Sequence, residues 1–152
     1  MKVTDLVLEH YAEESFTFDL GRKYKQRKDS KPVGFWLSVQ GEDDWPSWCR
    51  SERFRLAHLE NKHIVTMRES ANVLFLETEL DIFKFNSVFA ATEQWRWGID
   101  WPKVAQTWDG IVIAPYQWNL RFDQEVSWYY GWDCASGCIW NLEAIESVEV
   151  AE

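Results

Sequence analysis

YYGWDCASGCIWN, residues 129–141, is the stretch on which the predicted fold of this chain depends. Aromatic and other strand-favouring residues stand on both sides of residues 135–137, which are small. We therefore predict two strands, over 127–133 and 137–141, joined by a tight turn. The small turn residues would let a flat ligand approach the backbone, with tryptophans on either side of it.

Alternating apolar and polar residues predict further strands upstream. In DLVLEHYA, residues 5–12, this pattern predicts the first strand. In KPVGFWLSV, residues 31–39, it places Trp36 and Ser38 on the face opposite the apolar positions. Four more strands are predicted at 15–20, 63–67, 72–78 and 109–116.

Three segments carry the signals of short helices. A helix is predicted over 42–55, where acidic residues precede a proline in the first turn. Apolar residues recur at helical spacing over 79–90. In a third helix over 100–108, Asp100 is the predicted N-cap and Pro102 stands in the first turn.

Together these elements predict the fold class α+β. We expect two small, packed, mainly antiparallel sheets covered by two or three short helices. The 152 residues contain no repeat or linker and fit one domain, 1–152. A domain of this length buries roughly 70% of the surface that its unfolded chain exposes.

Charge and composition exclude several classes of function. The net charge of −9 opposes contact with phosphates, so a nucleic-acid partner is not expected. No apolar run approaches the ~20 residues of a membrane-spanning helix, so no membrane partner is expected. An odd number of cysteines and no signal-peptide pattern predict a reduced, cytoplasmic protein. The eleven tryptophans predict a dense aromatic core, an aromatic-lined pocket, or both.

The cysteines raise two chemical alternatives. Cys134 and Cys138 are spaced like one pair of zinc ligands, but the sequence has no second pair, so no metal site is predicted. Cys49 stands in the first turns of a predicted helix, a position that can activate a thiol. We favour buried structural cysteine over both alternatives.

Aromatic and small polar residues collect near the predicted strand ends, on the first helix and in the last turn. Such groups can stack on a flat ligand and hydrogen-bond its edge, so they are candidates for a binding site. A lone histidine beside a tyrosine is more often structural, but the other members of the set favour a ligand site. The candidates are His10, Tyr11, Trp36, Ser38, Trp48, Asp133 and Ser136.

GFWLSVQGEDDWPSWC, residues 34–49, resembles a segment of the ADP-ribosyltransferases of the histidine-tyrosine-glutamate class. In that family a first-strand histidine binds the nicotinamide ribose, and a strand tyrosine and a helix tyrosine sandwich the nicotinamide. The resemblance implies NAD as the cofactor, His10 on the ribose, and Trp36 and Trp48 on the nicotinamide. The implied cofactor contacts are His10, Tyr11, Trp36, Ser38 and Trp48.

The catalytic glutamate of that family has no counterpart in this sequence. The family strand that carries the glutamate resembles SGCIWN, and there Ser136 or Gly137 stands at the glutamate position. Asp133 is the nearest carboxylate and the first substitute, ahead of Glu125 and Glu143. The implied catalytic residues are His10, Asp133 and Ser136.

The leading hypothesis is an NAD-binding, mono-ADP-ribosyltransferase-like protein that modifies a macromolecular target, with a protein target favoured. One alternative is a non-enzymatic acidic protein that inhibits a host defence factor through the carboxylates of 41–45 and 143–152. Another is a nucleotide-binding sponge on the same fold. The stretches 99–116 and 128–140 also resemble parts of small uncharacterised bacteriophage proteins, which implies a phage origin.

Overall fold

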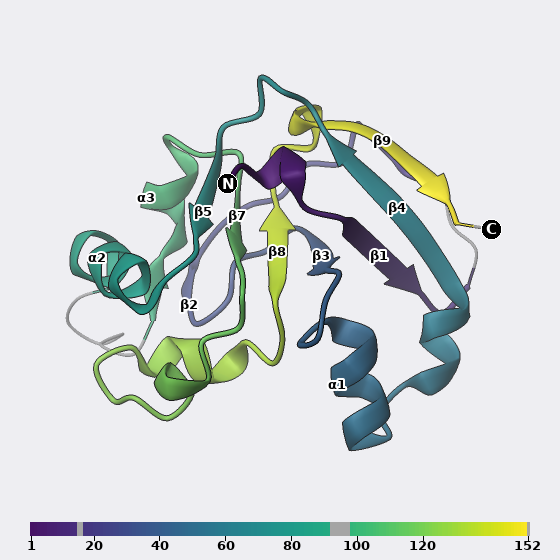
Figure 1. Cartoon of the computed structure of the whole chain (residues 1–152). Coiled ribbons are helices and arrows are strands. Elements are labelled where there is room, and N and C mark those ends of the chain that lie inside the picture. The colour runs from purple at the N-terminus through teal and green to yellow at the C-terminus, as the bar shows by residue number, and fades with distance from the viewer. Residues whose placement is uncertain (15–16, 92–97, 152) are drawn as a thin grey trace.

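A seven-stranded mixed sheet forms the centre of the protein (Figure 1). The structure, a computed structural model, describes residues 1–14, 17–91 and 98–151. In spatial order the strands are β5 (Val73–Leu76), β7 (Gly110–Ile113), β8 (Ser136–Ile139), β3 (Phe35–Val39), β1 (Leu8–Ala12), β4 (Asn61–Met67) and β9 (Ile145–Val150). β5 and β7 are parallel, and every other neighbouring pair in this sheet is antiparallel. β2 (Lys28–Asp29) and β6 (Ile99–Asp100) form a separate two-stranded sheet.

Three α-helices accompany the sheet in the described residues, at the places where the sequence predicts them. Each begins after a residue whose side chain accepts a hydrogen bond from the backbone of the first turn, namely Asp44, Thr78 or Asp100. The N-cap predicted at Asp100 is therefore confirmed. The helices are α1 (Trp45–Glu52), α2 (Glu79–Phe89) and α3 (Trp101–Ala105).

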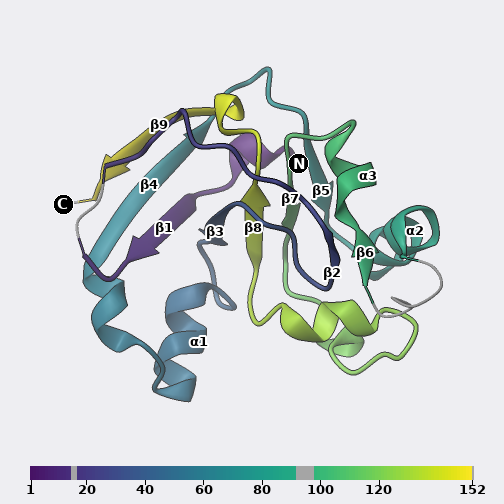
Figure 2. The same cartoon turned by 180° about the vertical axis from the view of Figure 1, so that it is seen from behind.

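The helices lie at two places around the large sheet. α2 and α3 lie beside β5, whereas α1 lies below β3 and β1 (Figure 1). From the opposite side, the small sheet lies next to α3 (Figure 2). Short 3-10 helices occupy the connections: η1 (Val3–Asp5), η2 (Leu56–Glu60), η4 (Trp118–Leu120), η5 (Ser127–Gly131) and η6 (Leu142–Ala144).

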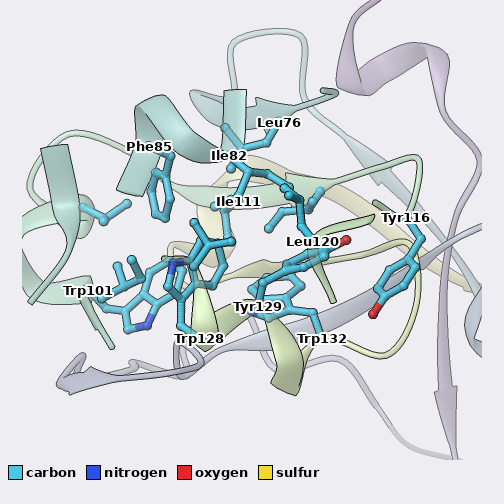
Figure 3. Packing of buried hydrophobic residues seen from close by; sticks show 14 of the residues in the cluster. Leu76, Ile82, Phe85, Trp101, Ile111, Tyr116, Leu120, Trp128, Tyr129 and Trp132 are labelled. Atoms are coloured by element: carbon cyan, nitrogen blue, oxygen red, sulfur yellow. The ribbon is translucent and has the colours of Figure 1, made fainter. Parts of the chain in front are cut away.

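Aromatic side chains fill the core between one face of the sheet, α2, α3 and η5 (Figure 3). Three of the indole N–H groups donate to protein oxygens at 2.7–3.0 Å, which removes the cost of burying them unpaired. A second apolar cluster lies on the other face, with its largest strand contributions from β3 and β4 and with residues from β1, β7, β8 and β9. The aromatic core that the composition predicts is present. Among the described residues, the buried tryptophans are Trp101, Trp128, Trp132 and Trp140.

The predicted strand pair at 127–133 and 137–141 is wrong. Ser127–Gly131 form the 3-10 helix η5, and β8 pairs instead with β3 and β7. Trp128 and Tyr129 are buried in the aromatic core, and their packing overrides the strand preference of these residue types. The predicted tight turn at 135–137 is therefore absent, since Ser136 and Gly137 lie within the strand.

Other boundaries also differ from the prediction. The large sheet replaces the two small packed sheets, because β8 and β3 pair directly and join the two halves. The stretch 143–152, interpreted as an acidic tail, contains the edge strand β9. The strand predicted at 15–20 lies partly outside the described residues, and 17–20 form no strand. Helix α1 ends before Arg53, whose backbone is left-handed with φ 53°.

The first prediction concerns the close approach of β7 to β8. A Cβ atom on Gly137 would lie 2.7 Å from Val112 Cγ2 and 2.8 Å from the Ile111 carbonyl oxygen. We expect Gly137→Ala to lower the free energy of unfolding by about 2–3 kcal/mol, because backbone and core must shift. Urea denaturation would measure the loss.

Gly21→Ala is the matched control, because a Cβ there meets only the Asp19 carboxylate oxygen, at 3.3 Å. That substitution should change the free energy of unfolding by less than about 0.5 kcal/mol. Equal effects at Gly137 and Gly21 would show that the approach of β7 to β8 does not constrain the fold.

Candidate functional site

A pocket of about 410 Å³ lies over one face of the large sheet, between β1, β3, α1 and the residues that lead into β8. Its volume is within the range of small-molecule sites. The structure brings six of the seven residues predicted from the sequence into its wall. These six are His10, Tyr11, Trp36, Ser38, Asp133 and Ser136.

Strand register places polar residues in a row across the floor of the pocket. Glu9 of β1 is paired with Ser38 of β3, which is paired in turn with Ser136 of β8. Because side chains alternate along a strand, Trp36 and Tyr11 lie on this same face. The floor is therefore built by three neighbouring strands that are far apart in the sequence.

Glu9 is one of the pocket residues that the sequence analysis missed. It is 1% exposed, and one carboxylate oxygen lies 2.5 Å from Lys62 Nζ. The Tyr11 hydroxyl donates to the other oxygen at 3.2 Å. The sequence pattern that could have identified Glu9 is the alternation of side chains along the first strand, which puts Glu9 on the same face as Tyr11. A carboxylate with two partners is thus held in the pocket wall.

Burial raises the pKa of Tyr11 well above its usual range, and the Glu9 carboxylate raises it further. The hydroxyl therefore keeps its proton at neutral pH and donates to Glu9. This hydrogen bond and the Lys62 ion pair fix both carboxylate oxygens, which reduces the freedom of Glu9 to turn toward a ligand.

His10 contributes to the pocket wall, but its ring belongs to the other face of the sheet. The imidazole stacks on Phe35 with ring centroids 4.0 Å apart, and Nδ1 lies 2.7 Å from the Trp36 carbonyl oxygen. Burial lowers the pKa of His10, so the neutral form donates through Nδ1 to that carbonyl. This geometry makes His10 a support for Trp36 and argues against its predicted contact with a ribose.

The two serines of the floor also have local partners. Ser38 Oγ accepts a hydrogen bond from the Trp45 backbone at 2.9 Å and so ties β3 to the start of α1. Ser136 Oγ donates to the Cys134 carbonyl oxygen at 3.0 Å. Both hydroxyls line the pocket while they position its backbone.

Aromatic rings form the walls. Trp36 and Trp132 meet edge to face at 5.1 Å, and Lys31 Nζ lies 5.7 Å from the Trp36 ring centroid. The predicted clamp residue Trp48 does not line the pocket: Trp45 lines it, and Trp48 stacks on Trp45 at 5.2 Å. The two residues lie three positions apart on α1, so they share one side of the helix, and sequence spacing did not tell which one faces the pocket.

The rest of the pocket wall includes the carboxylate of Asp133, the thiol of Cys134 and the imidazole of His58. Asp133 is half-buried at the wall, while burial raises the pKa of Cys134 to about 12. Cys134 is therefore a protonated thiol at neutral pH and a poor nucleophile. Cys49 and Cys138 are buried as well.

Among the described residues, no group of three or more histidine, cysteine or acidic side chains is arranged to hold a metal ion.

Besides Glu9 Oε2, which is paired with Lys62, two residues of the wall contain a buried polar atom that is unsatisfied among the described residues. Within the described part of the chain, Trp132 Nε1 and His58 Nδ1 have no hydrogen-bond partner. Buried polar groups in folded proteins are nearly always paired with protein, water or ligand. Both atoms have almost no accessible surface, so the suitability of the pocket for a flat ligand depends instead on the indole rings and polar side chains of its wall.

Comparison with known proteins yields no match to a family model, to a curated protein or to a solved structure. In residues 1–14, 17–91 and 98–151, no helix is both long and apolar enough to cross a bilayer. The chemistry of this pocket must therefore be argued from its own residues.

The second prediction concerns the Glu9–Lys62 ion pair. Lys62→Met leaves the Glu9 carboxylate buried without its counter-charge, and we expect the free energy of unfolding to fall by about 2–4 kcal/mol. Adding Glu9→Gln to this variant should recover part of the loss, because the amide carries no charge and still accepts from Tyr11. A double-mutant cycle at pH 7 measures the coupling, and additive effects would contradict the pairing.

The third prediction concerns pH. The pKa of His10 is lowered in the folded state, so the unfolded chain binds the proton more tightly. Its contribution to stability is complete above the ordinary histidine pKa of 6.5 and is lost as the pH falls below that value.

His10→Asn keeps a donor for the Trp36 carbonyl and removes the titration. We expect the free energy of unfolding to decline less between pH 7.5 and pH 5 in His10→Asn than in the wild type. His58, whose pKa burial also lowers, is present in both proteins and cancels in the comparison. Parallel pH profiles would show that His10 does not titrate with folding.

Proposed function

We propose that the pocket binds NAD and that the protein is a cytoplasmic, mono-ADP-ribosyltransferase-like protein with a macromolecular target. The observation that carries this proposal is the convergence on one pocket of five residues chosen from the sequence for an NAD site, since the ring of the sixth, His10, lies on the other face of the sheet. That pocket also has the size and the mixed aromatic and polar wall of a nucleotide site. The resemblance supplies the choice of NAD, and the geometry supports it.

The aromatic wall suits a nicotinamide ring. The ring is flat and cationic in NAD, and the face of an indole attracts cations. In the proposal Trp36 and Trp45, rather than Trp48, contact the nicotinamide, and His10 positions Trp36.

The charge in the wall suits the reaction. Loss of nicotinamide breaks the glycosidic C–N bond, the electron pair leaves with the ring nitrogen, and positive charge develops on the ribose. A nucleophile of the target then bonds to the ribose carbon and loses its proton. Asp133 is the carboxylate assigned to the developing charge, because Glu9 is already bonded to Lys62 and Tyr11. Ser136 lies in the same wall and acts through the backbone it holds.

The acidic inhibitor is the weaker candidate because two of the three acids of residues 41–45 have structural roles. Asp44 caps α1, and Asp43 accepts a hydrogen bond from Trp118 Nε1 at 3.1 Å. Glu42 is exposed and is the remaining acid of that stretch. The nucleotide sponge uses the same pocket without turnover, so one assay separates it from the enzyme.

The fourth prediction is that the pure protein releases free nicotinamide from NAD, and that NAD quenches its tryptophan fluorescence. Asp133→Asn should lower the release rate by about 100-fold or more and leave binding unchanged, since it removes the charge but not the shape. Trp45→Ala should weaken NAD binding by about tenfold through loss of a stacking face.

Glu42→Gln is the matched control, because it neutralises an acid outside the pocket wall, and it should behave as wild type. Quenching without nicotinamide release would identify the sponge. If the protein neither binds NAD nor releases nicotinamide, the proposal is overturned.

A further inference from the structure

One strongly charged group in the pocket wall has no role in the proposed reaction. Arg55 lies in the connection between α1 and η2, and its side chain is 48% exposed. A guanidinium that is partly in solvent and partly in a pocket wall stands at the mouth of that pocket. It therefore meets a ligand at the end that extends out of the pocket.

The present partner of Arg55 is weakly held. Nε and Nη2 donate to the same oxygen of Glu13, at 3.2 and 2.8 Å. This arrangement lacks the two parallel hydrogen bonds that make guanidinium pairs strong. The Glu13 side chain is 62% exposed and lies outside the pocket wall, and exposed ion pairs contribute little to stability. Replacing Glu13 by another anion as the partner of Arg55 therefore costs little free energy.

The backbone holds Arg55 at the mouth without help from Glu13. Arg53 and Arg55 have φ values of 53° and 47°, in the left-handed region that non-glycine residues seldom adopt. Hydrogen bonds from the Phe54 backbone to Cys49 and from the His58 backbone to Arg55 fix this turn. Strained backbone of this kind persists where surrounding structure imposes it, and it clusters at ligand sites.

The other charged groups of the wall are already engaged or carry the wrong sign for an anion. Glu9 is paired with Lys62, and Lys31 lies over the Trp36 ring. Asp133 is negative and repels an anion. Arg55 is thus the cation of the wall that an anionic part of a ligand can reach at the mouth.

We propose that Arg55 is the phosphate-binding residue of this pocket and that it exchanges the Glu13 carboxylate for the pyrophosphate of a dinucleotide. The proposal rests on the proposed function, since it takes the pocket to be the nucleotide site. A pyrophosphate accepts two parallel hydrogen bonds from the planar guanidinium and carries more negative charge than Glu13. Glu13 then acts as a competitor that keeps Arg55 extended when no ligand is bound.

Calorimetric titration with inorganic pyrophosphate, ADP-ribose and nicotinamide tests this assignment. Arg55→Ala should weaken pyrophosphate and ADP-ribose binding by about tenfold or more, as loss of hydrogen bonds to a charged group does. Nicotinamide binding should not change. Glu13→Gln should tighten both phosphate ligands by about two- to fivefold, the size of an exposed ion pair. A purely structural Arg55–Glu13 pair predicts weaker binding in both variants.

Arg53→Ala is the matched control, because Arg53 has the same left-handed backbone and lies outside the pocket wall. The Arg53→Ala variant shows how much affinity for pyrophosphate is lost through disturbance of the strained turn alone. Wild-type protein that does not bind pyrophosphate, or equal losses in Arg53→Ala and Arg55→Ala, would overturn the assignment even if NAD is cleaved. Pyrophosphate binding that depends on Arg55, without NAD binding or cleavage, would support the assignment and overturn the proposed function.

Discussion

The close packing of β8 between β7 and β3 is the constraint on which the rest of the structure depends. All four residues of β8 are buried, and Gly137 lies against the Val112 side chain and the Ile111 carbonyl. A side chain there would push β7 away and break the link between the two halves of the sheet. The same pairing brings Ser136 next to Ser38, so the strand contact that closes the sheet also builds the floor of the pocket.

Several of the described tryptophans divide between the core and the pocket wall. Trp101, Trp128 and Trp140 fill the core and donate their indole N–H groups to protein oxygens. Trp36 and Trp45 face the pocket, where their rings are available to a ligand. Trp132 belongs to both sets, since it packs in the core and lines the pocket. A rigid aromatic core behind an aromatic wall keeps that wall in place, which is the condition for a preorganised site.

Charge in the pocket is arranged by depth. Glu9 is fully buried and is paired with Lys62 and Tyr11, Asp133 is half-buried, and Arg55 lies at the mouth with an exposed partner. Because the effective dielectric constant rises toward solvent, the deep pair is fixed while the pair at the mouth can be exchanged. This gradient suits a ligand with a cationic ring at one end and phosphates at the other, which is the chemistry of NAD.

Local patterns in the sequence were sufficient for most of the elements and for much of the site. Strand alternation predicted the strand around Trp36 and the face it shares with Ser38, and capping chemistry predicted the start of α3 at Asp100. These features depend on residues within one or two turns or strand positions of each other, so the sequence by itself determines them.

Only the tertiary structure decided the rest, because those features depend on partners far away along the chain. Ser127–Gly131 became a 3-10 helix because its aromatic residues pack in a core assembled from α2 and α3. Glu9 became a site residue through Lys62, and Trp45 took the place of Trp48 through the position of α1 against β3. A residue's neighbours across a sheet are set by register and long-range packing, which no local pattern encodes.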